Sequence, residues 1–228
     1  MNSRDRIGDF TEGDFQCRTS DSINPALTFR FASSVFRAVA RAQKRSLLDA
    51  VEISATVVLI VFGMYYANLA LQGRMTAFGI LPRTLWGLLG ILFCPLLHYN
   101  QAHLTANGLS LFILLTVLFL HKEYRPNKAF ISIWILSGLG TWLIGRAWHG
   151  DQPIFHIGAS GLIYGLVTYL TAAAWWLRSW TSAVWAIVIL FLYGGIFYGA
   201  LPQPGIISWE GHLSGAIAGV IVAYRQHK

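Results

Sequence analysis

A single serine in an apolar, glycine-rich stretch raises the question of what reaction it could support. Ser160 lies in the segment IGASGLIYGL, residues 157–166, in which Tyr164 carries the only other hydroxyl group. A serine hydroxyl is a weak nucleophile, so it needs a neighbouring general base that takes its proton. Histidine suits this task because its ordinary pKa lies near neutrality. The partner of Ser160 should therefore be a histidine that helix packing can bring beside it.

Glycines at four-residue intervals indicate His212 as that partner. Each candidate residue stands in such a series, with Gly161 and Gly165 following the serine and Gly211, Gly215 and Gly219 surrounding the histidine. Small residues at this spacing let two helix backbones approach closely. No acidic residue is placed to orient the imidazole, because Glu210 is expected to point elsewhere on the helix. The sequence thus predicts a dyad of Ser160 and His212.

A second pair of polar residues could stabilise the anion that such a reaction creates. His103 and Asn107 are four residues apart, which places them on one face of a helix. The backbone N–H of Ser160 would lie in the first turn of its own helix, where amide groups lack partners and the helix dipole is positive. These three groups are the donors that we expect around the oxyanion of an acyl-transfer reaction.

The composition assigns the chain to the integral membrane proteins. Of its 228 residues, 55% are hydrophobic and 12% are charged, whereas a soluble domain carries about 25% charged residues. The net charge of +7 does not indicate nucleic-acid binding, because the basic residues flank apolar segments and form no RNA-binding motif. The two cysteines, Cys17 and Cys94, have no zinc-site spacing and are not expected to form a disulfide.

Six apolar segments are interpreted as membrane helices, which need about 20 residues each. They cover residues 53–71, 101–120, 130–148, 158–177, 182–201 and the shorter 212–224. Residues 79–97 are also apolar, but if they do not cross, the basic clusters of the short loops all fall on the cytoplasmic side. The sequence therefore predicts an all-α membrane protein, a six-transmembrane-helix bundle with both termini in the cytoplasm. Residues 73–97 would form an outer loop partly embedded in the outer leaflet.

The polar residues of these spans gather toward the outer half of the predicted bundle. They are His98, His103, Asn107, Ser160, Tyr164 and His212. Polar groups at membrane depth are costly and usually face the bundle interior, and unrelated ones would be scattered between the two sides. One site facing the outer side is therefore expected. His149 and His156 flank an outer loop and are expected at the membrane interface.

The first 50 residues differ from the rest, so residues 1–50 are predicted to be a cytoplasmic tail and residues 51–228 the membrane domain. Residues 27–45 combine apolar side chains at helical spacing with basic ones on another face. This pattern fits an amphipathic helix on an anionic lipid surface and fits a solvated, partly helical tail equally well.

The motifs together resemble the rhomboid family of intramembrane serine proteases. The matching pieces are His98-x-x-x-x-His103-x-x-x-Asn107, Gly158-Ala159-Ser160-Gly161-x-x-Tyr164 and Gly211-His212-x-x-Gly215-x-x-x-Gly219. Their order and separation within about residues 51–228 fit the six-span core of that family. The resemblance implies a serine endopeptidase without metal or cofactor, which cleaves membrane proteins within or just outside a transmembrane helix.

The resemblance also implies a role for each matching residue. Ser160 corresponds to the nucleophile and His212 to the general base, while His103 and Asn107 correspond to the oxyanion-binding pair. Three further matches support these groups: Tyr164, whose ring stacks on the catalytic imidazole, Gly158, which leaves room beside the nucleophile, and His98, a structural histidine at a loop–helix junction.

Two features concern the segments around this site. Many members of the family carry a Trp-Arg pair in the outer loop, whereas here Trp86 is followed by Gly87 and the nearest basic residue is Arg83. How the outer loop is anchored is therefore open at the level of sequence. The fifth span and the loop 201–211 are expected to form a movable gate for the substrate.

Two other functions would use the same residues differently. A non-catalytic relative that binds membrane clients would lack the serine or the histidine, yet both are present. A transmembrane haem or metal carrier would use histidines in facing pairs and show a visible absorption band; its candidates are His98, His103, His156 and His212. Under the protease hypothesis the partners are membrane-protein substrates and the lipid bilayer, and not nucleic acid.

Overall fold

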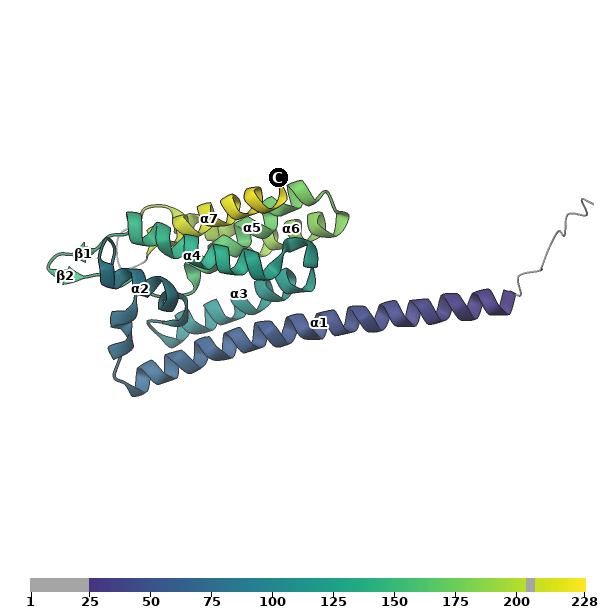
Figure 1. Cartoon of the computed structure of the whole chain (residues 1–228). Coiled ribbons are helices and arrows are strands. Elements are labelled where there is room, and N and C mark those ends of the chain that lie inside the picture. The colour runs from purple at the N-terminus through teal and green to yellow at the C-terminus, as the bar shows by residue number, and fades with distance from the viewer. Residues whose placement is uncertain (1–24, 204–207) are drawn as a thin grey trace, which may run out of the picture. The chain divides into compact units, whose positions relative to one another are not determined.

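The computed structural model describes the backbone of residues 25–203 and 208–228 and the side chains of residues 47–203 and 208–228. Figure 1 shows the arrangement of the elements, which are mostly helices joined by short loops. The long helices are α1 (Pro25–Ala70), α3 (Gln101–Leu120), α4 (Pro126–Ile144), α5 (Ser160–Leu177), α6 (Trp180–Tyr193) and α7 (Trp209–His227). The shorter elements are η1 (Arg74–Phe78), α2 (Leu85–Phe93), η2 (Cys94–Leu96), η3 (Lys122–Tyr124), β1 (Trp148–His149), β2 (Gln152–Pro153) and η4 (Gly194–Ala200).

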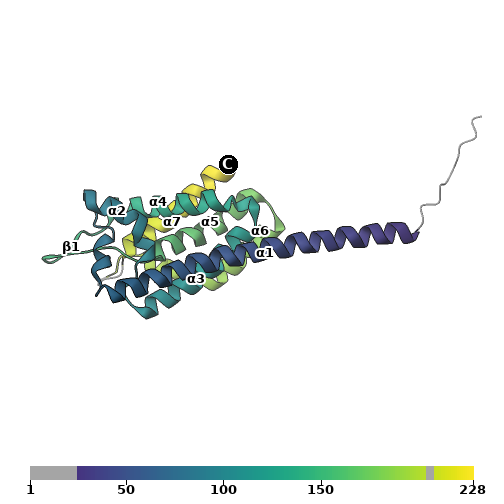
Figure 2. The ribbon, with the colours of Figure 1, turned by 60° about the horizontal axis from the view of Figure 1, so that its bottom comes forward.

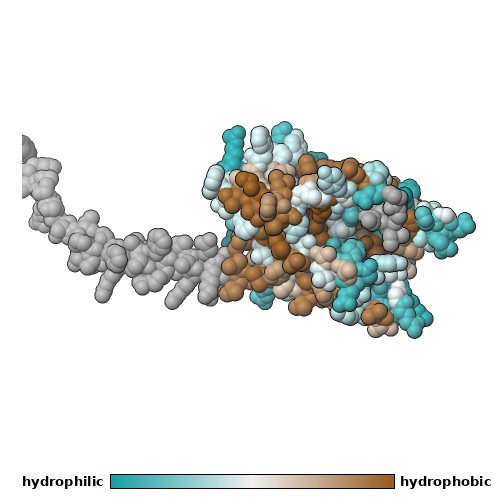
Figure 3. All heavy atoms as spheres, turned by 180° about the vertical axis from the view of Figure 1, so that it is seen from behind, coloured by the Kyte–Doolittle hydropathy of each residue, from teal (hydrophilic) through white to brown (hydrophobic). Residues whose placement is uncertain are grey.

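Five helical segments of the described chain are long and apolar enough to cross a membrane. They are Leu47–Ala70, Gln101–Leu120, Lys122–Ile144, Ser160–Leu177 and Trp180–Ala200. Figure 3 shows hydrophobic side chains over much of the visible face of the bundle, as a lipid-facing surface requires. The sixth predicted span, α7, has 19 residues but carries Glu210 and Arg225 in its end turns. Length and composition therefore support five spans, and α7 as a span stays a prediction.

The predicted span 130–148 has different limits in the structure. The helix α4 begins earlier, at Pro126, because proline is well accommodated in the first turn of a helix. It ends at Ile144, and the apolar residues that follow belong to the β1–β2 hairpin, in which Trp148 pairs with Pro153. An apolar run can be strand or helix, and here the helix ends where Gly145, its C-cap residue, takes an extended backbone conformation.

The loop between α1 and α3, which the sequence predicts to be an outer loop, is anchored to the end of α4. Its helix α2 has nine residues, so it rises about 14 Å and is too short to cross a bilayer. The guanidinium of Arg83 donates to the carbonyl oxygens of Leu143 and Gly145 at 3.1 and 2.8 Å. The indole of Trp142 donates to the carbonyl of Thr84 at 2.8 Å. Arg83 thus ties the loop to α4 without a Trp-Arg pair.

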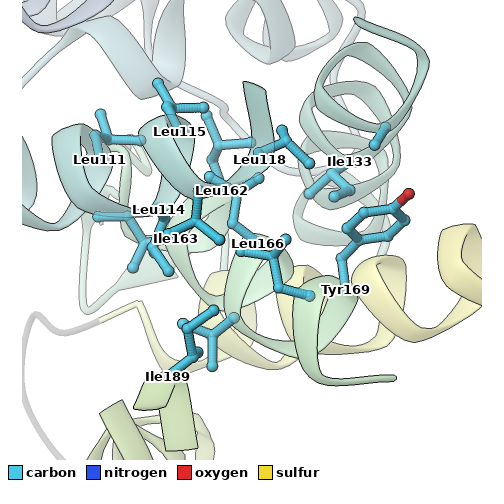
Figure 4. Close-up of a cluster of buried hydrophobic side chains, with 14 of the residues drawn as sticks. Leu111, Leu114, Leu115, Leu118, Ile133, Leu162, Ile163, Leu166, Tyr169 and Ile189 are labelled. Carbon is cyan, nitrogen blue, oxygen red and sulfur yellow. The ribbon is translucent and has the colours of Figure 1, made fainter. Parts of the chain in front are cut away.

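The hydrophobic core forms around α5, which lies between α3, α4, α6 and α7. Figure 4 shows residues of α3, α4, α5 and α6 meeting there, among them Leu114, Leu166 and Ile133. On the far side of α3, the part of α1 that covers residues 47–70 runs alongside it in both ribbon views (Figures 1 and 2), and the ring of Phe62 packs over Gly108. The core fixes the position of α5, whose first residue is Ser160.

The helices α5 and α7 pack through their glycines, which confirms the packing that the four-residue spacing predicts. A Cβ atom on Gly215 would lie 1.9 Å from the carbonyl oxygen of Gly161, and one on Gly219 would lie 2.1 Å from that of Gly165. A carbon atom cannot approach an oxygen so closely, so only glycine permits this contact. The close approach holds the N-terminal turns of both helices side by side.

Candidate active site

The structure brings the side chains of Ser160 and His212 into contact. Ser160 begins α5, and His212 lies near the start of α7. The Oγ of Ser160 lies 2.9 Å from Nε2 of His212, although 52 positions separate the two residues. This distance is within the range of a hydrogen bond between a nucleophile and its base.

The second ring nitrogen of His212 determines which proton the imidazole carries. Nδ1 lies 2.8 Å from the carbonyl oxygen of Gly199, in η4. A carbonyl oxygen can only accept a hydrogen bond, so the proton of the neutral ring must lie on Nδ1. The lone pair of Nε2 then faces the hydroxyl group of Ser160, which is the arrangement that proton abstraction requires.

The ring of Tyr164 packs against the flat face of the His212 imidazole. Its ring stacks on that of His212 with a centroid distance of 4.3 Å and an angle of 9°. Its hydroxyl group donates to the carbonyl of Ile196 at 2.5 Å, so the same side chain also holds η4. The stacking restricts rotation of the imidazole and keeps Nε2 directed at Ser160.

The two predicted oxyanion donors lie beside the backbone that precedes Ser160. A Cβ atom on Gly158 would lie 2.8 Å from Cε1 of His103 and 3.7 Å from Nδ2 of Asn107, and the φ of Gly158 is +118°. Both the space and the left-handed backbone conformation require glycine at this position. His103 and Asn107 thus face the same turn of backbone, one turn of α3 apart.

His98 is a structural partner of Asn107. The Asn107 amide lies 3.0 Å from Nε2 of His98 and donates to it, because an NH₂ group cannot accept a hydrogen bond. His98 is buried, and burial, with a smaller effect from His103, lowers its pKa to about 4. Its ring is therefore neutral at physiological pH and available as an acceptor, which fixes the orientation of Asn107.

An open cavity of about 680 Å³ adjoins these groups. The predicted site residues in its wall are His103, Asn107, Ser160, Tyr164 and His212. The β1–β2 hairpin also contributes His149 and Gln152 to the lining. This volume is within the range of ligand-binding pockets, and both Ser160 and His212 line it.

A second polar cluster lies beside the dyad, and it corrects the expectation for His156. His156 is 3% exposed, so it does not lie at the interface. Its Nε2 lies 2.9 Å from the carbonyl oxygen of Arg146, and its Nδ1 lies 2.6 Å from Oγ of Ser208. The carbonyl requires a proton on Nε2, so the hydroxyl of Ser208 donates to Nδ1. Burial lowers the pKa of His156, which favours this neutral form.

Glu210 belongs to the same cluster and points away from His212, as expected. Its side chain is 1% exposed, and its carboxylate accepts hydrogen bonds from the guanidinium of Arg146. Ser208 also caps α7, since its hydroxyl oxygen accepts from the N–H of Gly211 at 3.3 Å. The cluster therefore joins the loop after α4 to the first turn of the helix that carries His212.

Sequence reasoning missed this cluster because its members are distant and individually ordinary. Glu210 and Arg146 are charged residues on the outer ends of apolar segments, where solvent exposure is the default. The signal that could have revealed the pair is that Glu210, one of only ten acidic residues in the chain, lies two positions before His212. Residues 204–207 of the expected gate loop lie outside the described residues.

Within residues 47–203 and 208–228, no three His, Cys, Asp or Glu side chains are grouped so that they could hold a metal ion. The rings of His98 and His103 are 5.2 Å apart in an edge-to-face arrangement. Nε2 of His98 accepts the hydrogen bond from the Asn107 amide.

Comparison with known proteins adds a family assignment to this geometry. A family model described as Rhomboid domain matches residues 82–228. An uncharacterized protein of Mycobacterium tuberculosis is 44% identical over 175 residues, which cover 74% of this chain and 73% of that protein. An uncharacterized protein of Mycobacterium leprae is 40% identical over 143 residues, or 61% of this chain and 55% of the relative. A putative rhomboid protein of Acanthamoeba polyphaga mimivirus is 29% identical over 126 residues, or 54% of this chain and 67% of the relative.

Proposed function

The chain belongs to the rhomboid family, and from this premise we propose that it is an intramembrane serine endopeptidase whose catalytic dyad is Ser160 and His212. The observation that carries the proposal is the 2.9 Å contact between Oγ of Ser160 and Nε2 of His212. The carbonyl of Gly199 at Nδ1 supports it, because it leaves the unprotonated nitrogen toward the serine.

The reaction begins with attack of the Ser160 hydroxyl oxygen on the carbonyl carbon of a substrate peptide bond. His212 takes the hydroxyl proton on Nε2 as the C–O bond forms, and the substrate carbonyl oxygen becomes an anion. His212 then returns the proton to the leaving amine as the C–N bond breaks. Water from the open cavity attacks the resulting ester, with His212 again as the base, and the product acid leaves Ser160 free.

The oxyanion of this reaction would be held by His103, Asn107 and the backbone N–H of Ser160. Asn107 donates one N–H to His98, which leaves its second N–H for the developing anion. The Ser160 amide is in the first turn of α5, where N–H groups have no partner within the helix. Donors that are already in place need no reorganisation when the charge develops.

The proposed substrates are membrane proteins that enter from the bilayer. A peptide bond inside a helix is shielded by its own hydrogen bonds, so the substrate helix must unwind to present a carbonyl to Ser160. The segment Trp180–Ala200 is the proposed entry gate, because it packs least against the rest of the protein. Only 6% of its most apolar 18-residue stretch is buried, compared with 56% for the corresponding stretch of Ser160–Leu177.

The proposed domain arrangement and orientation follow from the charges of the short loops. Residues 51–228 would form the catalytic domain with α7 as a sixth span, and residues 1–50 a cytoplasmic tail. Lys122, Arg125 and Lys128 lie at one end of the bundle, which would be the cytoplasmic end by the positive-inside rule. The dyad would then open toward the outer side.

Covalent labelling tests the proposal directly. The full-length protein, purified in detergent, is treated with a fluorophosphonate probe, which reacts with activated serines. The parent should be labelled, and Ser160→Ala and His212→Ala should lose most or all of the label. Ser132→Ala is a matched control, because this serine lies on α4 outside the cavity, and it should label as the parent does. Equal labelling of the parent and Ser160→Ala would exclude Ser160 as the nucleophile.

A further inference from the structure

We propose that the backbone carbonyl of Gly199 positions the general base, so that the dyad is organised only while η4 is seated against His212 and Tyr164. This inference rests on the proposed function, because it concerns the base of the proposed dyad. It assigns to a segment of the entry gate a second task, which is to hold the imidazole in the productive proton arrangement.

The hydrogen bonds of His212 are the first support. Among the residues that the structure describes, the ring nitrogens of His212 contact two groups, Oγ of Ser160 and the carbonyl oxygen of Gly199. The nearby acid, Glu210, accepts its hydrogen bonds from Arg146. In serine hydrolases with a triad, an acid on Nδ1 fixes the tautomer and orientation of the histidine. Here the Gly199 carbonyl occupies that position.

The backbone at Gly199 is fitted to this contact. A Cβ atom on Gly199 would lie 2.0 Å from the Tyr164 hydroxyl oxygen and 3.4 Å from Nδ1 of His212. Any larger residue must therefore displace either η4 or the tyrosine. The same element contains Gly194 and Gly195, and a Cβ atom on either would have nothing within 4 Å. The requirement for glycine is thus specific to the residue whose carbonyl contacts the base.

Tyr164 joins the base to the same element. Its ring stacks on His212 with centroids 4.3 Å apart, and its hydroxyl donates to the Ile196 carbonyl at 2.5 Å. The imidazole is therefore attached to η4 both directly, through Gly199, and indirectly, through Tyr164. A shift of η4 changes both contacts together.

The element η4 directly continues α6, and together they form the span Trp180–Ala200. Of the five candidate spans in the described chain, this one has the smallest buried fraction. Segments with few buried contacts open at the lowest cost in free energy. If a substrate displaces α6 to enter, η4 moves with it and the carbonyl leaves Nδ1. The base is then unconstrained until η4 returns, so productive proton transfer requires the gate to be seated again over the substrate.

The test uses a small probe that does not need the gate. Second-order rates of fluorophosphonate labelling are measured on the full-length parent, Gly199→Ala and the matched control Gly195→Ala. Two titratable groups, His103 and Glu210, act on His212 electrostatically and a third, Tyr164, stacks on its ring, and all three are present in these variants. The labelling rate of Gly199→Ala should fall at least about tenfold, because the tautomer is no longer fixed, while Gly195→Ala should label at the parent rate.

A rescue variant separates misplacement of the carbonyl from general damage. In Tyr164→Phe/Gly199→Ala the hydroxyl that the new methyl group meets at 2.0 Å is removed, and the remaining contacts are 3.3 Å or longer. η4 can then return, so the double variant should label faster than Gly199→Ala alone. For cleavage of a membrane substrate, Gly199→Ala should lower kcat with little change in KM.

The labelling results distinguish a failure of the proposed role of the Gly199 carbonyl from a failure of the proposed function. Labelling of Gly199→Ala at the parent rate would overturn the role of the carbonyl and leave the dyad intact. A parent protein that is not labelled at Ser160 would overturn the proposed function, and the inference with it.

Discussion

Gly215 of α7 lies against the carbonyl oxygen of Gly161 of α5 so closely that a Cβ atom would be 1.9 Å from that oxygen. These glycines stand one residue after Ser160 and three residues after His212. The separation of the two helix axes at this point sets the distance between the hydroxyl and the imidazole. Packing between two glycines therefore determines whether the dyad can form.

The first prediction is that Gly215→Ala separates the dyad. The added methyl group must push α7 from α5, and overpacking of this kind destabilises proteins by about 1–3 kcal/mol. We expect a lower melting temperature in detergent and a loss of Ser160 labelling. Gly194→Ala is the control, since a Cβ atom there meets nothing within 4 Å. A Gly215→Ala protein with parental labelling and stability would contradict the packing argument.

The second prediction concerns the oxyanion donors. His103→Ala and Asn107→Ala should each lower kcat by roughly 10²–10³-fold with a small effect on KM, because their hydrogen bonds strengthen as the anion develops. Thr105→Ala provides a matched control on α3, since this exposed side chain bonds within its own helix, to the carbonyl of Gln101. Cleavage kinetics on a reporter with a transmembrane helix measure the effect. A rise in KM at constant kcat would show that the two residues bind the ground state instead.

How much of this site the sequence predicts depends on the range of the signal. The Ser160–His212 contact follows from helix periodicity and glycine spacing, which act within single helices and fix their faces. The limits of α3 follow from a mostly apolar run without charged residues or proline, between Asn100, whose side chain caps the helix, and His121. In these elements the residue types themselves indicate where the helix begins and ends and which of its faces is packed.

The remainder depends on backbone contacts between distant segments, and the residue types do not reveal which segments are the partners. The contact of the Gly199 carbonyl with His212 is of this kind, because every residue has a carbonyl group. His156, which is buried, forms an isolated backbone bridge with Ile80, so it lies against the loop between α1 and α3. Such placements are set by tertiary packing and override the expectation of exposure for polar loop residues.

The third prediction is a pH dependence of stability due to His98. Its pKa is lowered from 6.5 to about 4 by burial, so the unfolded state binds the proton more tightly than the folded state. Stability is therefore fully present above about pH 6.5 and falls as the pH decreases toward 4. The full shift corresponds to roughly 3 kcal/mol.

The comparison of the parent with His98→Gln isolates this effect. Glutamine offers an acceptor to Asn107 but has no proton to gain in this range. Thermal unfolding in detergent, measured between pH 4 and 7.5, should show a steeper decline on the acid side for the parent than for His98→Gln. Parallel declines for the two proteins would mean that His98 is not the group responsible.

The fourth prediction is an asymmetry between the two members of the buried ion pair beside the dyad. Glu210 is 1% exposed, whereas the side chain of Arg146 is 34% exposed. Arg146→Gln leaves a buried carboxylate without its cation, and breaking a buried pair in this way costs about 3–5 kcal/mol. Glu210→Gln removes the buried charge itself and leaves an arginine that can reach water, so it should cost less. Thermal unfolding of both variants measures the difference, and Arg83, which also lies near this cluster, is unchanged in both.

Because α7 begins at this pair, Arg146→Gln should also slow Ser160 labelling more than Glu210→Gln. Equal losses of stability, or a larger loss for Glu210→Gln, would show that the burial of the carboxylate does not govern this end of the helix.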